Sequence, residues 1–285
     1  MVLATIQSHI GATNGIINGN FIIRYFAVPL MYLEAGLSCD PKSLYSTLRD
    51  GYLLTFVMVF VYILMPFLVR IGTYLLMTYA KVNIWLLKGM EVLYCMPPPF
   101  STGLALCRLA QADLPTSVIT TLLGTSTPPL VGINIREIIY STLFPLGMGI
   151  ILRMFILKNK FLDVNTSWFS QGLLLIIAYH WFCDAVVADA SSLQAVDVLF
   201  CVLIACLAQI FLSSLCWILC SQWLPRNVLL AALFTSTHKS VSLGGWILRG
   251  AYHGSAHGPA VNLPLRILPV AQLLLGSLLA SWLAP

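Results

Sequence analysis

A short polar stretch interrupts an apolar segment near its middle, and this feature constrains the fold more strongly than any other. Residues 235–245 read TSTHKSVSLGG, between NVLLAALF (227–234) and WIL (246–248). The interrupted segment is long enough to cross a bilayer, so His238 and Lys239 lie at membrane depth. A lysine at that depth costs roughly 3 kcal/mol or more unless it faces a wet cavity or a partner. A residue retained at that cost is by default a functional one.

A second interruption lies in the first half of the chain. Residues 90–108 read MEVLYCMPPPFSTGLALCR, an apolar segment broken by Pro97, Pro98 and Pro99. Consecutive prolines remove backbone donors and clash with the preceding turn, so a helix cannot continue through them. The two breaks lie close to half a chain length apart. Matched, interrupted segments in corresponding halves are the sequence pattern that indicates the binding site of a secondary transporter.

The composition is that of a polytopic membrane protein. Hydrophobic residues make up 59% of the 285 residues and charged residues 9%, with a mean hydropathy of +0.90, whereas soluble domains carry about 25% charged residues. The net charge of +5 comes from cations scattered between apolar runs, which argues against nucleic acid as a partner. The eight cysteines show no CxxC spacing, and no P-loop or nucleophile motif occurs. We therefore expect reduced cysteines, no bound metal and no enzyme activity.

The apolar runs predict ten spans within one membrane domain (1–285). The first run has about half the length that a helix needs to cross the hydrocarbon core, so it is either a re-entrant stub or the product of a late start of the chain. The third ends at residue 69 or, through a kink at Pro66, at residue 79. The predicted spans are 1–10, 21–37, 51–69 or 51–79, 84–109, 116–133, 138–156, 168–187, 196–219, 227–248 and 260–283.

The distribution of cations favours one orientation. The connections that follow even-numbered spans hold Lys42, Arg49, Arg108, Arg153, Lys158, Lys160 and Arg226, and the opposite connections hold chiefly Lys81, Lys88, Arg136 and Arg249. By the positive-inside rule both termini are then cytoplasmic. The broken spans, the fourth and the ninth, are an odd number of spans apart and cross the membrane in opposite directions. This is the topology of an inverted repeat.

Several motifs resemble the bile acid sodium symporter family, in particular its divergent, SBF-like branch. They are LEAGLS (33–38), WLLKG (85–89), CMPPPFSTG (95–103), FCD (182–184), STHKSVSLG (236–244) and AQLLLGSLL (271–279). The resemblance implies an all-α fold of ten spans in two inverted five-span repeats, with the broken spans four and nine crossing each other. It also implies a panel domain (about 1–50 and 136–190) and a core domain (about 51–135 and 195–285), with substrate between them and sodium beside the crossing.

The ninth span departs from the pattern of that family. In the better understood bile acid carriers this span supplies an acidic residue to sodium, whereas THKSVSLGG contains no carboxylate. A lysine at this position would repel Na⁺ or replace it electrostatically. This argues against sodium coupling, so H⁺ stands beside Na⁺ as a candidate coupling ion. No cofactor is expected.

The candidate site for substrate or ion gathers polar groups of the two breaks and of two neighbouring spans. Lys239 would attract an anionic head group or gain and lose a proton, and helix N-termini at the breaks would add positive charge. The alternatives are an ordinary loop at the prolines, a lysine that reaches the membrane surface, and hydroxyls that bond between helices. The candidate residues are Pro97, Pro98, Pro99, Ser101, Thr102, Thr125, Ser126, Ser236, Thr237, His238, Lys239, Ser240, Ser242 and Gln272.

Four further ionisable residues lie within apolar spans. Arg24 and Glu34 share the second span but are too far apart to pair, so each either faces the panel cavity or contacts another span. His180 and Asp184 share one helix face, where a metal or a general base could be built. They lack a third ligand, so we expect interfacial residues instead.

These observations favour a secondary transporter that moves a small organic anion by alternating access. The resemblance links this branch with calcium homeostasis and with glycoconjugate and matrix formation. The alternative is therefore a membrane regulator of calcium entry or of the secretory pathway, with little flux of its own. The short connections weigh against a scaffold, and the sequence specifies no protein partner. Plasma, Golgi and endoplasmic reticulum membranes all remain candidate locations.

Overall fold

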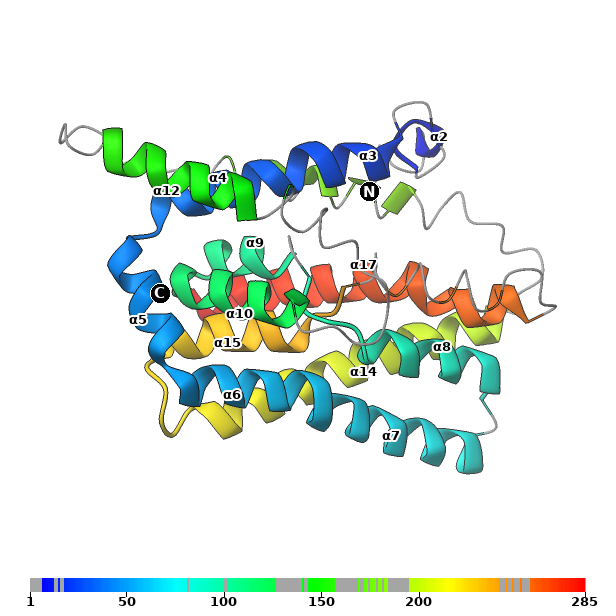
Figure 1. Cartoon of the computed structure of the whole chain (residues 1–285). Helices are drawn as coiled ribbons and strands as arrows, with labels where there is room; N and C mark the ends of the chain where they lie inside the picture. The colour runs from blue at the N-terminus through cyan, green and yellow to red at the C-terminus, as the bar shows by residue number, and fades with distance from the viewer. Residues whose placement is uncertain are drawn as a thin grey trace.

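The regular secondary structure of the described residues is entirely helical (Figure 1). A computed structural model describes residues 7–12, 15, 18–80, 82–99, 102–126, 140, 143–156, 169, 172–173, 175–177, 179–180, 182–183, 195–240, 244, 248, 252 and 257–284. The regular elements within these ranges are α-helices and two π-helical turns. The all-α class that the family resemblance implies is therefore confirmed for the described residues.

Among the residues that the structure describes, three continuous rods are long and apolar enough to cross a membrane. The first joins α6 (Gly51–Val59), η2 (Phe60–Leu64) and α7 (Met65–Tyr79) into 29 residues, and α14 (Ala195–Cys220) and α17 (Gly258–Leu283) have 26 residues each. About 20 apolar residues suffice to span the hydrocarbon core. The third predicted span therefore takes its longer form and continues through Pro66 to residue 79.

Each π-helical turn is followed by a proline. In the rod formed by α3 (Gly19–Ile22), η1 (Ile23–Ala27) and α4 (Val28–Ser38), the N–H of Val28 bonds the carbonyl five residues earlier. The N–H of Met65 does the same after η2. In that register the next carbonyl in each rod would need the N–H of Pro29 or Pro66, which proline lacks. The prolines therefore leave a main-chain acceptor in the middle of each rod.

Both predicted helix breaks are present. In the first half, α8 (Ile84–Tyr94) ends before Pro97–Pro99, which are non-helical, and α9 (Thr102–Leu109) begins after them. In the second half, α15 (Arg226–Thr237) ends at His238, whose backbone is extended (φ −88°, ψ 149°). The triple proline and the polar stretch therefore end helices as predicted.

The connection between the second and third predicted spans contains a further helix. It is α5 (Pro41–Arg49), which has proline in its first turn and Leu44 as its buried residue. The side chain of Asp50 accepts a hydrogen bond from the Leu53 N–H and so caps the start of α6. This short helix turns the chain from α4 into the first long rod at one end of the molecule (Figure 1).

The helices form two packed groups. A short α2 (Ser8–Gly11), α3, α4 and α12 (Phe144–Ile156) lie along one side, and the long rods lie on the other side (Figure 1). The larger apolar cluster joins η2, α8, α9, α14, α15 and α17. A second cluster joins α4 and α12 to α9 and α10 (Leu114–Ser126). Both groups therefore meet at α9.

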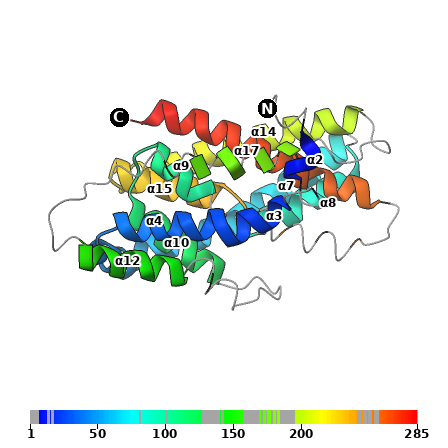
Figure 2. The same ribbon diagram turned by 90° about the horizontal axis from the view of Figure 1, so that it is seen from above.

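Helices α4 and α12 approach each other through glycines (Figure 2). A Cβ atom added at Gly36 would lie 3.0 Å from the Gly149 Cα atom, and one added at Gly149 would lie 2.9 Å from the Gly36 Cα atom. Small residues allow such close packing of membrane helices. The two helices therefore form one tightly packed pair.

Replacing Gly149 with alanine tests this packing. The added methyl group meets main-chain atoms of α4, so we expect Gly149→Ala to lower stability by about 1–3 kcal/mol. Gly147 lies on the same helix and has open space around its Cβ position, so Gly147→Ala is the control and should be neutral or stabilising. Thermal unfolding of the purified protein in detergent measures both. Equal stability of the two variants would contradict the contact.

Candidate functional site

The two breaks contact each other directly. The Ser240 N–H donates to the Pro97 carbonyl over 2.9 Å. Beyond this point α9 runs along α15, and Gly103 of α9 faces the main chain of Thr235. After the end of α9, the Asp113 N–H donates to the Asn227 carbonyl at the start of α15 over 3.1 Å. Segments about half a chain apart therefore meet at their interruptions.

Lys239 is buried at this contact. Its side chain is 2% exposed, and its Nζ atom donates to the Val61 carbonyl over 3.0 Å. Val61 lies in the π-helical turn, and its carbonyl is the one that Pro66 leaves without an N–H donor. The lysine therefore uses an acceptor supplied by the first long rod. Pro66 inside an apolar span was the sequence signal for this acceptor, and sequence analysis had assigned it only a kink.

His238 bridges α15 and α17. Its Nε2 atom lies 3.2 Å from the Gln272 carbonyl oxygen, and its Nδ1 atom lies 3.3 Å from the Thr237 hydroxyl. A Cβ atom at Gly276 would lie 2.6 Å from the His238 Nε2 atom. Glycine at this position of α17 therefore makes room for the imidazole ring.

Two glutamines extend the contact into a buried polar network. The Lys239 N–H donates to Gln272 Oε1 over 3.3 Å, and Gln272 Nε2 donates to Gln209 Oε1 over 3.3 Å. Gln209 Nε2 in turn lies 3.4 Å from the Thr237 hydroxyl. Gln272 was predicted from the sequence and Gln209 was not. A glutamine in the middle of the apolar 26-residue α14 is, however, as strong a sequence signal as Gln272.

The end of α10 lies beside the same contact. Gly124 packs against Pro98, where an added Cβ atom would lie 2.7 Å from the ring, and the Tyr62 hydroxyl donates to the Gly124 carbonyl. Thr125 is buried and donates to the Thr121 carbonyl of its own helix over 2.8 Å. Tyr62, which sequence analysis missed, therefore ties the π-helical turn to α10.

The remaining candidate residues take varied positions. Thr102 begins α9. Ser236 is buried, with its hydroxyl 3.4 Å from the Cys216 thiol, and Pro99 is buried at the break. Ser101, Ser242 and the side chain of Ser126 lie outside the described residues. Thr120 and Thr235, which were not predicted, bond to each other over 3.1 Å and join α10 to α15.

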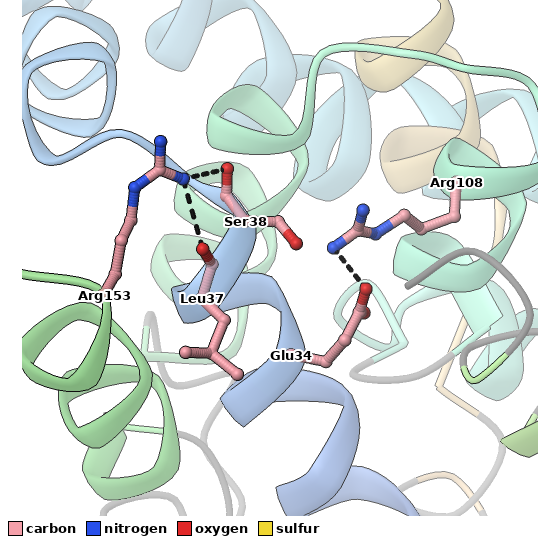
Figure 3. Close-up of polar contacts among 5 residues, drawn as sticks. All are labelled: Glu34, Leu37, Ser38, Arg108 and Arg153. Atoms are coloured by element: carbon pink, nitrogen blue, oxygen red, sulfur yellow. Dashed lines mark hydrogen bonds and ion pairs between the residues drawn. The ribbon is translucent and has the colours of Figure 1, made fainter. Parts of the chain in front are cut away.

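Glu34 contacts another helix rather than its own. Its Oε1 atom lies 2.7 Å from Arg108 Nη2 on α9, and both side chains are largely buried (Figure 3). His180 Nδ1 lies 2.8 Å from the Gly11 carbonyl oxygen. The side chain of Arg24 and all of Asp184 lie outside the described residues. Within the described residues, no group of three or more His, Cys, Asp or Glu side chains is placed to hold a metal.

A cavity of about 620 Å³ lies behind the network, between α14 and α17. Its lining is mostly apolar, and Gln209 and Ser213 are among its polar members. It is separate from the junction of α4 with α9. Gln209 therefore belongs both to the polar network and to the wall of this cavity.

The arrangement offers one buried amine and one buried imidazole beside two interrupted helices. The amine follows the C-terminus of α15, where the helix dipole favours a cation. It also occupies a main-chain carbonyl that could otherwise bind a metal cation. Such a site can hold an anionic group or exchange a proton.

Comparison with known proteins agrees with this architecture. The SBF-like CPA transporter family matches residues 1–285. Sodium/bile acid cotransporter 7 of Gallus gallus is 28% identical over 296 residues, which cover 98% of this chain and 88% of the relative. Sodium/bile acid cotransporter 7-B of Xenopus laevis is 29% identical over 310 residues, which cover 99% and 90%.

The match therefore extends over the whole length of the chain, including both broken segments. This confirms the resemblance found in the sequence motifs. The chain belongs to the SBF-like CPA transporter family, a family of multi-pass membrane transporters and not of enzymes.

Proposed function

We propose that this chain is a secondary transporter that moves a small organic anion by alternating access. The observation that supports the proposal most is the hydrogen bond between the two breaks, with Lys239 buried beside it. Broken helices that meet at mid-membrane form the binding sites of many secondary transporters. A buried cation at that position favours a negatively charged substrate group.

The moving parts are a panel (about 1–50 and 136–190) and a core (about 51–135 and 195–285). The tight packing of α4 on α12 supports the panel as one body. The larger apolar cluster, which binds the long rods to the broken helices, supports the core as the other. In this scheme ten spans form two inverted repeats with both termini in the cytoplasm, and substrate binds where panel and core face each other.

Lys239 takes the place of a coupling cation in this scheme. Its ammonium group donates a hydrogen bond to the Val61 carbonyl, and residues 235–245 contain no carboxylate to attract Na⁺. A fixed positive charge removes the need for a bound sodium ion. Coupling would then come from a proton gradient or from the substrate's own gradient.

The resemblance extends the proposal to the setting of the protein. A plasma, Golgi or endoplasmic reticulum membrane is the expected location, and disturbed calcium homeostasis or glycoconjugate formation is the expected consequence of loss. A membrane regulator without flux is the alternative.

Anion uptake into proteoliposomes tests the proposal. A panel of organic anions is offered with a Na⁺ gradient, with a pH gradient and with neither. We expect uptake that does not need Na⁺ and that falls about tenfold or more in Lys239→Ala, because a hydrogen bond to a charged group contributes about 1.5–3 kcal/mol. Lys88→Ala is the matched control, since Lys88 is exposed on α8 above the Trp85 ring.

Two results would contradict the proposal. If no anion moves under any gradient while the reconstituted protein remains folded and monodisperse, the regulator alternative is the better one. If uptake of every anion survives in Lys239→Ala, the lysine is not part of the substrate site.

Replacing Pro66 with alanine tests how Lys239 is held. The new N–H would compete with the lysine for the Val61 carbonyl, so we expect uptake to fall about threefold to tenfold, which corresponds to about 1 kcal/mol for one net hydrogen bond. Pro29→Ala is the control, because Pro29 follows the equivalent π-helical turn in the other rod. Equal uptake by both variants would show that the proline does not position the lysine.

A further inference from the structure

A buried ion pair joins two helices that belong to different packed groups. Glu34 lies on α4, Arg108 lies on α9, and the Arg108 Nη2 to Glu34 Oε1 distance is 2.7 Å (Figure 3). The Glu34 side chain is 4% exposed and the Arg108 side chain is 13% exposed. Removing one partner of such a pair leaves an uncompensated buried charge. The contact therefore strongly favours the arrangement in which α4 and α9 touch.

Glu34 lies on a helix that is fixed to α12. Arg153 of α12 donates from Nη1 to the carbonyls of Leu37 and Ser38, which end α4 (Figure 3). Lysine and arginine side chains commonly bond the last carbonyls of a helix in this way. Together with the glycine contact, this ties the end of α4 to α12, so Glu34 has a rigid base.

Arg108 lies on a helix that is fixed to the group of long rods. It lies in the last turn of α9, and the next residues after α9 bond to the start of α15 through the Asp113 N–H. Leu106 and Cys107 on the same helix belong to the larger apolar cluster. The ion pair therefore connects two bodies, each of which is held together by its own contacts.

We propose that Glu34 and Arg108 form a latch that closes the cleft between panel and core at the end of the molecule where α5 lies. The inference rests on the proposed function, because it assigns α4 to the panel and α9 to the core. Apolar side chains on the same two helices, including Met31, Ala35 and Leu104, lie buried beside the pair. The latch must part when the cleft opens at this end.

Cys39 is a built-in reporter of the latch. It directly follows the last residue of α4, where its N–H bonds the Ala35 carbonyl, and it is 1% exposed. Opening of the cleft at this end would uncover it. Among the other cysteines, Cys95 is exposed and Cys206 is half-buried, so these two are replaced by serine in every variant of the test.

The test measures how fast a membrane-permeant maleimide labels Cys39 in the reconstituted chain, by peptide mass spectrometry. We expect Glu34→Gln and Arg108→Gln each to speed labelling about tenfold or more, because each removes one charge of the pair. Loss of the Arg108 cation does not favour the reactive thiolate, so faster labelling of that variant reports exposure of Cys39. The exchanged pair, Glu34→Arg with Arg108→Glu, should restore protection. Cys201, fully buried in the larger cluster, is the internal control, because its labelling would rise only if the whole protein unfolded.

A second arm tests whether the latch must part. Cysteines are placed at both positions (Glu34→Cys with Arg108→Cys) and joined by a short cleavable bifunctional thiol reagent. Uptake should stop on cross-linking and return on cleavage. Continued uptake by the cross-linked protein would overturn the latch.

The labelling arm does not depend on transport, so the two proposals can fail separately. Labelling of Cys39 at the same rate in the parent chain and in Glu34→Gln, with Cys201 protected in both, would overturn the latch even if the chain transports anions. Faster labelling in Glu34→Gln that the exchanged pair reverses would support the latch even if no anion moved, and the proposed transport function alone would then fail.

Discussion

The burial of one ammonium group is the constraint on which the rest of the structure depends. Lys239 needs an acceptor within an apolar interior, where an unpaired charge would be too costly. The acceptor is the Val61 carbonyl, which remains available because Pro66 has no N–H to donate to it. The bond fixes the first long rod against the break in the second half. A proline that disturbs one helix thus positions a lysine from another.

The two breaks also complement each other chemically. Consecutive prolines have carbonyls but no N–H groups, so the first break carries surplus acceptors. The second break presents backbone N–H groups that lie beyond the end of α15, outside the hydrogen-bonding pattern of that helix. The Ser240 N–H of the second break donates a hydrogen bond to the Pro97 carbonyl of the first break. Non-helical backbone at membrane depth persists only where protein or water supplies such partners. Each break therefore needs the other to be stable.

The sequence predicted the helix ends and the buried polar residues well, because prolines and charges within apolar runs have few alternative explanations. It did not predict the partners. The acceptor for Lys239 is the main chain of a valine, and the donor to the Gly124 carbonyl is a tyrosine in another span. Neither is visible in a pattern of side-chain types. The partner of Glu34 is also in another helix, α9. It was not predicted, because spacing along one helix gives no information on contacts between helices.

Two kinds of polar contact within the membrane therefore differ in what they can do. The network around Lys239 consists of several linked bonds among α14, α15 and α17, so breaking it would leave many buried groups unpaired at once. The pair of Glu34 and Arg108 is compact, lies near the ends of α4 and α9, and joins bodies that are each secured elsewhere. Separation there breaks one contact between two bodies rather than a chain of linked bonds. A linked network suits a fixed frame, and a terminal ion pair suits a contact that opens and closes.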